Sequence, residues 1–206
     1  VTGGLHFDTK DIADDITSAK GYRQFFTNYL ENESIFTPAE CNLIRYQISN
    51  LRDWTLAVGS DGMTATDAND RGAFMLGGAG SDTLTGGAAS DLLVGGAGAD
   101  TLTGGAGDDR LLGGADSDTY QFTADGSRDT VLDSDGQGKL EIDGQALTGG
   151  TASIKKNVWE DKERKITYTF IGNDEIVAYG RLIIEGDDLA GGRITIEKFD
   201  LGHAES

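Results

Sequence analysis

Five aspartates recur at intervals of nine residues in the middle of the chain; they are Asp82, Asp91, Asp100, Asp109 and Asp118. Each one ends a six-residue run that begins with two glycines, and a leucine or tyrosine follows two residues later. Carboxylates in such a pattern can bind metal ions or act as general acids and bases. The segment 77–126 holds eight aspartates but only one basic residue, Arg110. Because basic side chains do not neutralise these carboxylates, the pattern indicates a bound cation.

The nine-residue period predicts a coil of short strands. A glycine pair tolerates positive φ and close backbone approach, so each six-residue run is expected to form a turn. The remaining three residues form a strand whose middle residue, Leu84 in the first repeat, points inward. Two turns and two strands make a coil of eighteen residues, and neighbouring coils lie ~4.8 Å apart. Residues eighteen apart therefore stack on one another in a parallel β-roll.

Stacking brings the carboxylates together along two edges of the roll. Asp82 lies over Asp100 and Asp100 over Asp118, while Asp91 lies over Asp109 on the other edge. Two carboxylates ~4.8 Å apart repel each other by ~3–4 kcal/mol at an effective dielectric of ~20. Either these aspartates are protonated or a cation lies between them. Carboxylate and carbonyl oxygens at a flexible spacing favour calcium over zinc or copper, and magnesium, which demands a stricter octahedron, is the weaker candidate.

The repeat GGxGxDxUx over residues 77–121 resembles the RTX, or haemolysin-type, calcium-binding nonapeptide. The resemblance implies a parallel β-roll with Ca²⁺ between turns that are eighteen residues apart, and three or more ions in this chain. Positions are counted from the first glycine of each nine-residue repeat, so that the aspartate stands at position six. The resemblance implies that each ion takes the carbonyls of positions one and three of one turn. It takes those of positions two and four of the next turn in the stack, and the aspartates of both turns. The implied ligand sets are Gly77, Ala79 and Asp82 with Gly96, Gly98 and Asp100; Gly86, Ala88 and Asp91 with Gly105, Gly107 and Asp109; and Gly95, Ala97 and Asp100 with Gly114, Asp116 and Asp118.

The chain departs from this pattern at two places inside the repeats and at both ends. Ala89 and Asp116 replace the glycine of position four, so Ala89 is expected to strain its turn if positive φ is needed there, and Asp116 to add either a ligand or only charge. Residues 66–70 resemble an imperfect first turn and residues 125–133 an imperfect last one, with Asp129 in position six. These flanking turns are candidates for one or two further calcium sites.

The rest of the chain divides into two further zones, and the fold class expected is mainly β. Apolar residues at helical spacing predict helices over 11–31 and 37–54, in a helical cap of residues 1–57. The β-roll is expected over 58–136. Strand-like segments separated by turn residues predict a C-terminal β-rich capping segment over 137–206.

One outer face of the predicted roll is apolar. Leu76, Val94 and Leu112 stack at intervals of eighteen residues and should not face water. We expect either the N-terminal helices or the C-terminal strands to cover this column. The alternative is a surface for a partner.

Composition narrows the function classes. The 206 residues carry a net charge of −18, which argues against nucleic-acid binding, and no apolar run approaches the length of a membrane span. Cys41 is the single cysteine, which excludes an internal disulfide. His6 and His203 lie at opposite ends, and the chain contains neither GxSxG nor HExxH. We therefore expect no catalysis in this chain, and any catalysis in a part of the parent protein not present here.

The flanking sequence also resembles that of RTX proteins. The tail 166–199 resembles the strand-rich segment that follows the repeats in type I secreted bacterial proteins, and residues 67–76 resemble sequence upstream of them in secreted lipase-like proteins. The resemblance implies an extracellular module that folds on calcium after secretion and stabilises an attached effector. Its partners would be calcium, the rest of the parent chain and the type I secretion apparatus. Two alternatives are a non-catalytic part of a secreted lipase or phospholipase, and a calcium-rigidified adhesin module. The chain begins at Val1 without a basic and apolar leader, which predicts a fragment or processed chain with no cleavable signal peptide.

Overall fold

The computed structural model describes residues 55–58, 62–67, 72–133, 135–172 and 179–200. Within these ranges the chain is mainly β, with a single 3-10 turn at Asp187–Leu189. The predicted helices lie in residues 1–54, outside the described residues, and residues 55–57 of the predicted cap belong to a strand. Among the described residues, no helix is long and apolar enough to span a bilayer.

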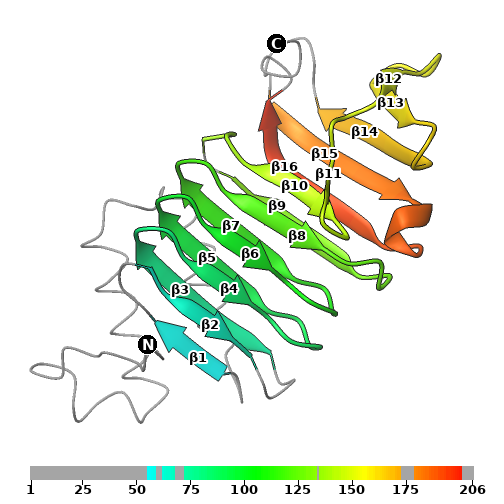
Figure 1. The fold of residues 1–206 in the computed structure, drawn as a ribbon. Coiled ribbons are helices and arrows are strands. Elements are labelled where there is room, and N and C mark those ends of the chain that lie inside the picture. The colour runs from blue at the N-terminus through cyan, green and yellow to red at the C-terminus, as the bar shows by residue number, and fades with distance from the viewer. Residues whose placement is uncertain (1–54, 59–61, 68–71, 134, 173–178, 201–206) are drawn as a thin grey trace, which may run out of the picture.

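The predicted β-roll is confirmed. Two parallel sheets face each other, and each coil contributes one strand to each sheet (Figure 1). The strands of the first sheet are β1 (Thr55–Val58), β3 (Ala73–Ala79), β5 (Leu92–Ala97), β7 (Arg110–Ala115) and β9 (Arg128–Leu132). Those of the second are β2 (Thr64–Thr66), β4 (Thr83–Thr85), β6 (Thr101–Thr103), β8 (Thr119–Phe122) and β10 (Lys139–Ile142), with β11 (Gln145–Ala146) antiparallel to β10 at its edge.

The register shows the predicted stacking of residues eighteen apart. Leu84 pairs with Leu102, and Leu102 with Tyr120, in the second sheet. The last coil is two residues longer than the eighteen-residue coils before it. The register shows this, since Leu112 pairs with Leu132, which lies twenty residues later. This insertion falls in the loop between β8 and β9, so the strands on both sides of it stay in register.

The inward residue of each repeat strand forms the core between the two sheets. The side chains that share this position are fully buried: Leu84, Leu93, Leu102, Leu111 and Tyr120. Met75, Phe122, Val131 and Ile142 extend the same cluster along the roll. The packing follows from the period-two alternation of each short strand, which directs its middle residue to the core.

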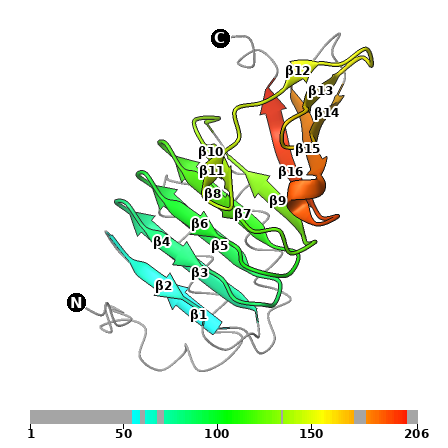
Figure 2. The ribbon, with the colours of Figure 1, turned by 45° about the vertical axis from the view of Figure 1, so that its right-hand side comes forward.

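The C-terminal strands extend the first sheet beyond the roll (Figure 2). Strand β16 pairs in parallel with β9, and the remaining strands follow it antiparallel. They are β12 (Thr151–Ala152), β13 (Val158–Asp161), β14 (Ile166–Gly172), β15 (Tyr179–Gly186) and β16 (Arg193–Asp200). Their apolar face continues the core, since Ile166, Ile184 and Ile194 belong to the same buried cluster as the repeat leucines.

The predicted apolar column lies on the outer face of the first sheet. Leu76, Val94 and Leu112 are neighbours in register and are at most 1% exposed. The C-terminal strands do not cover it in the described structure, because they pair edge to edge with β9 in the same sheet. The described C-terminal strands are therefore not the cover, and the N-terminal helices, the other expected cover, lie outside the described residues, so the expectation of one or the other stays a prediction.

Candidate metal centre

The aspartates of the repeat are joined by a ladder of hydrogen bonds between consecutive turns on the same edge. The N–H of Asp82 donates to Oδ1 of Asp100 over 2.8 Å, and the N–H of Asp100 donates to Oδ1 of Asp118 over 3.0 Å. One oxygen of each carboxylate therefore faces the preceding turn. The sequence predicted the stacking of the side chains but not this backbone contact.

The other edge repeats the arrangement and extends it to the degenerate last turn. The N–H of Asp91 donates to Oδ1 of Asp109 over 2.8 Å, and the N–H of Asp109 donates to Oδ1 of Asp129 over 3.0 Å. Asp129 thus occupies the position of a repeat aspartate although it lies twenty residues after Asp109. Residues 68–70 of the expected first turn lie outside the described residues, and Asp67 before them is buried.

The second oxygen of the carboxylate faces the following turn. A Cβ placed on Gly77 would lie 2.4 Å from Oδ2 of Asp82 and 2.5 Å from the carbonyl oxygen of Gly95. Both oxygens therefore lie in the gap between turn 77–82 and turn 95–100. Any side chain larger than that of glycine would fill this gap, which explains why position one is glycine in every repeat.

The carbonyls of positions two and four point toward the following turn. The carbonyl oxygen of Gly78 lies 2.1 Å from the place of a Cβ on Gly96, and that of Gly80 lies 2.5 Å from the place of a Cβ on Gly98. Gly96 has a φ of 121°, which glycine adopts easily and other residues do not. The carbonyl of position three points backward, since Ala115 accepts a hydrogen bond of 3.2 Å from the N–H of Gly98.

These directions reverse the pairing of carbonyls that the resemblance implied. Each gap receives positions two and four of the earlier turn and positions one and three of the later turn, where the opposite was expected. The carbonyl of position two keeps this direction even in turn 86–91, where Gly87 has no positive φ, and there it accepts a hydrogen bond of 2.9 Å from the N–H of Ala106 in the next turn. The first gap is therefore lined by Gly78, Gly80, Asp82, Gly95, Ala97 and Asp100.

Burial makes the ionised form of these carboxylates costly. Asp100, Asp109 and Asp118 are each 1% exposed, and within the described structure their Oδ2 atoms accept no hydrogen bond. Burial is the largest cause that raises the pKa of Asp100 and of Asp118 to about 7, and that of Asp109 to about 8. The neighbouring carboxylates raise these pKa values further, and the backbone N–H of the preceding turn opposes the shift. Burial likewise raises the pKa of Asp129 to about 6.

A calcium ion fits these gaps. The buried Oδ2 atoms need a positive partner, and the surrounding ligands are hard carboxylate and carbonyl oxygens. Among the described residues, no three histidine, cysteine, aspartate or glutamate side chains come close enough to hold a metal together.

The two departures from the repeat have different outcomes. Ala89 does not adopt positive φ, and neither does Gly87, so turn 86–91 takes a different path from the other turns and avoids the expected strain. In that turn the N–H of Gly87 donates to Oδ2 of Asp91 over 2.7 Å. Asp116 keeps the left-handed conformation, with a φ of 75°, and its carboxylate is exposed.

Sequence reasoning missed two residues beside the last repeat. The buried Tyr120 hydroxyl lies against Gly113 of turn 113–118, and the carboxylate of Asp133 lies beside that hydroxyl and against Gly138. The available signal was the segment 133–138, a six-residue run of aspartate and glycine whose order differs from the repeat.

Comparison with known proteins agrees with the geometry. The profile of the family described as RTX calcium-binding nonapeptide repeat (4 copies) matches residues 67–102 and 85–120. No curated protein sequence matches the chain.

Proposed function

We propose that this chain, whose residues 67–120 are RTX calcium-binding nonapeptide repeats, folds when calcium fills its turns and stabilises an effector to which it is attached. The observation that carries the proposal is the row of buried aspartates, whose Oδ2 atoms at Asp100, Asp109 and Asp118 accept no hydrogen bond. A buried polar group whose oxygen lacks a hydrogen-bond partner costs ~2–7 kcal/mol, and a charged one costs more. Calcium binding would remove this cost in the folded state only.

Linkage then couples folding to the calcium concentration. A ligand that binds only the folded state stabilises it in proportion to the logarithm of its concentration over its dissociation constant. Extracellular calcium modules bind at ~10⁻⁴–10⁻³ M. At the far lower calcium level of a cytosol, repulsion among the aspartates and the entropy of the glycines favour the unfolded chain.

This coupling suits export. An unfolded chain passes through a narrow channel, and calcium outside the cell then drives folding in the correct compartment. RTX repeats are typical of secreted bacterial proteins, which supports type I secretion and an extracellular location for this chain. We propose that the parent chain and the type I secretion apparatus are its partners.

We further propose that the chain itself is not an enzyme. Its buried aspartates are explained by cation binding, because each Oδ1 accepts a backbone hydrogen bond and each Oδ2 faces a carbonyl-lined gap. Catalysis by the parent protein would then belong to another part of the chain.

The test is circular dichroism of the chain in EGTA and in millimolar calcium, combined with a count of bound ions by equilibrium dialysis. The proposal expects little β-signal in EGTA, a cooperative gain of β-signal on adding calcium, and several bound ions. Magnesium at the same concentration serves as the control and should produce a much smaller gain. A β-signal that EGTA leaves unchanged, in a chain that binds no calcium, would refute the proposal.

A further inference from the structure

The turn that follows the last repeat stacks directly on it. Residues 133–138, of which residue 134 lies outside the described residues, follow β9 and precede β10, as the repeat turn 113–118 begins in the last residues of β7 and precedes β8. Leu112 pairs with Leu132 at one end of these turns, and Thr119 pairs with Lys139 at the other. The two turns therefore have the same length and lie one above the other.

The order of residues in turn 133–138 is the reverse of the repeat. A repeat turn begins with glycine and ends with aspartate, whereas this turn begins with Asp133 and ends with Gly138. Oδ2 of Asp133 lies 2.1 Å from the place of a Cβ on Gly138, and Oδ2 of Asp118 lies 2.1 Å from the place of a Cβ on Gly113. The carboxylate of Asp133 thus reaches across its turn from the opposite end and supplies the oxygen that position six lacks.

The gap between turns 113–118 and 133–138 contains a buried carboxylate oxygen without a hydrogen-bond partner. Oδ1 of Asp118 accepts the N–H of Asp100 in the turn below, so its Oδ2 is the oxygen that faces turn 133–138. In the described structure this Oδ2 accepts no hydrogen bond, and Asp118 is 1% exposed. The hydroxyl of Tyr120 is buried and lies 2.1 Å from the same Cβ place on Gly113; burial raises its pKa most, and the nearby carboxylates of Asp133 and Asp118 raise it further.

Tyr120 is the one exception among the inward residues of the five repeats, where the others have leucine. Leucine would leave this gap without an oxygen from the core side. The hydroxyl therefore appears in the repeat whose turn stacks beneath the reversed turn, where it adds a neutral oxygen. No ion pair found among the described residues gives Asp118 or Asp133 a basic partner.

A second carboxylate joins the two turns. In turn 95–100, the N–H of position four, Gly98, donates to the carbonyl of position three in the next turn, Ala115. Here the N–H of Asp116 donates over 2.8 Å to Oδ2 of Asp135, which stands in position three. Asp135 thus takes over the role of a backbone carbonyl in positioning the upper turn.

We propose that turns 113–118 and 133–138 hold a further calcium ion, ligated by Asp118 and Asp133 and by backbone carbonyls, in a site outside the nonapeptide motif. This inference rests on the proposed function, because it extends the same chemistry to a turn of reversed sequence. The ion neutralises the last gap of its edge, directly beside β9. Since β9 pairs with β16, filling this gap would complete the roll at the point where the C-terminal sheet begins.

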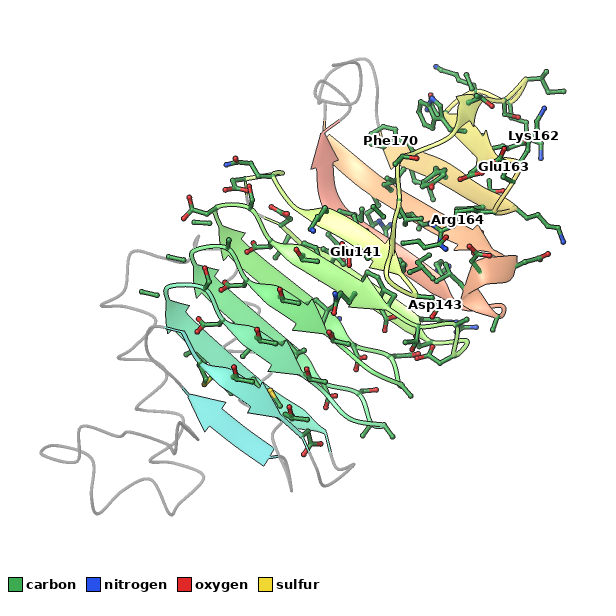
Figure 3. The ribbon with its side chains drawn as sticks, in the orientation of Figure 1. Glu141, Asp143, Lys162, Glu163, Arg164 and Phe170 are labelled. Atoms are coloured by element: carbon green, nitrogen blue, oxygen red, sulfur yellow. The ribbon has the colours of Figure 1, made fainter. Side chains whose placement is uncertain are left out.

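The experiment counts calcium ions bound to the full chain by equilibrium dialysis and follows their affinities by calorimetry. Asp133→Asn should bind one ion fewer than the wild type and keep the affinities of the others. Asp143→Asn is the matched control: Asp143 lies at the far end of β10, and it is exposed and left-handed, with a φ of 50° that asparagine tolerates (Figure 3). The control should bind the wild-type number of ions.

A rescue variant keeps the inference falsifiable if Asp133→Asn disturbs folding. The triple variant Y120L/D133G/G138D restores the order of the repeat and its inward leucine; Gly138 has no positive φ that would exclude aspartate, and the changes at 120 and 133 remove the atoms that a Cβ on Gly138 would meet at 2.6 Å and 2.1 Å. It should recover the lost ion, whereas Asp133→Gly alone should not.

The outcomes separate the two proposals. A wild-type chain that binds no calcium contradicts the proposed function. A wild type that binds calcium, with Asp133→Asn binding as many ions at the same affinities, contradicts only the further site, and would mean that Tyr120 and Asp133 close the roll without a metal.

Discussion

Asp109→Asn should change the stability of the fold in opposite directions with and without calcium. Asp109 is 1% exposed, and burial raises its pKa to about 8, against an ordinary value of 3.8. A shift of about four units corresponds to a penalty of ~6 kcal/mol on the charged form. Chain relaxation and water penetration reduce such penalties, so we expect the neutral asparagine to stabilise the calcium-free fold by ~2–3 kcal/mol at neutral pH.

With calcium the same substitution removes a ligand. Asparagine keeps an oxygen to accept the N–H of Asp91, which Oδ1 of Asp109 now accepts over 2.8 Å. Its amide group places donor hydrogens or a neutral oxygen in the gap where Oδ2 of Asp109 faces the following turn. Because calcium affinity depends on the number of charged ligands, the calcium midpoint should rise by roughly tenfold or more.

The assay follows the β-signal by circular dichroism in two titrations. In EGTA, trimethylamine N-oxide is added to induce folding, and the variant should fold at a lower concentration than the wild type. In the second titration calcium is added, and the variant should need more of it. Asp108→Asn is the control, since Asp108 is the exposed neighbour of Asp109. A variant that is less stable than the wild type in EGTA would refute the reasoning, because Asp109 would then act only as a hydrogen-bond acceptor.

Acid should partly replace calcium in stabilising the fold. Burial raises the folded-state pKa of Asp100 to about 7, above the ordinary value of 3.8. The calcium-free fold should therefore lose stability as the pH rises from 4 through 7 and regain it on acidification. A β-signal in EGTA that is equal at pH 5 and pH 8 would contradict this. Gly96→Ala should destabilise the calcium-bound fold by ~3 kcal/mol or more, because its Cβ would meet the carbonyl oxygen of Gly78 at 2.1 Å with a φ of 121°. The control is Gly136→Ala, where φ is 71° and a Cβ would meet no atom within 4 Å, so only the ~1–2 kcal/mol of left-handed strain is expected. If chemical unfolding showed the same loss of stability for both variants, the close stacking of the carbonyls on Gly96 would be contradicted. Arg164→Ala should lower the free energy of unfolding by ~1–3 kcal/mol and leave the number of bound ions unchanged. The guanidinium of Arg164 (Figure 3) donates hydrogen bonds to Asp188 and to the carbonyl of Ile142, away from the calcium turns. Loss of a bound ion in this variant would contradict its purely structural role.

The sequence predicted the roll because one period controls both strand and turn. Leucine at position eight fixes the inward face, and the glycine pair fixes the turn, so the stacking of Leu84 on Leu102 follows from spacing alone. The apolar outer column was predictable for the same reason, since Leu76 and Val94 are eighteen residues apart.

The direction of the carbonyls was not predictable from the spacing. A glycine in the sequence permits positive φ but does not say which way the neighbouring carbonyl points, and only the structure shows that the carbonyl of Gly78 approaches Gly96. The path of turn 86–91 was hidden for a related reason, because Ala89 permits one turn to differ while its aspartate stays in the ladder.

The pairing of β16 with β9 was beyond the reach of the sequence, because strand-like segments carry no signal for their partners. Its consequence is physical, since the last strand of a parallel roll exposes unpaired N–H and carbonyl groups, to which other chains can add. Strand β16 satisfies these groups, with Ile194 opposite Asp129 and Ile196 opposite Val131. Asp129 thus belongs at once to the carboxylate ladder and to the strand on which the C-terminal sheet is built. An ion that orders Asp129 therefore also orders the edge that β16 needs, so the C-terminal sheet should form with the calcium-bound roll and not before it.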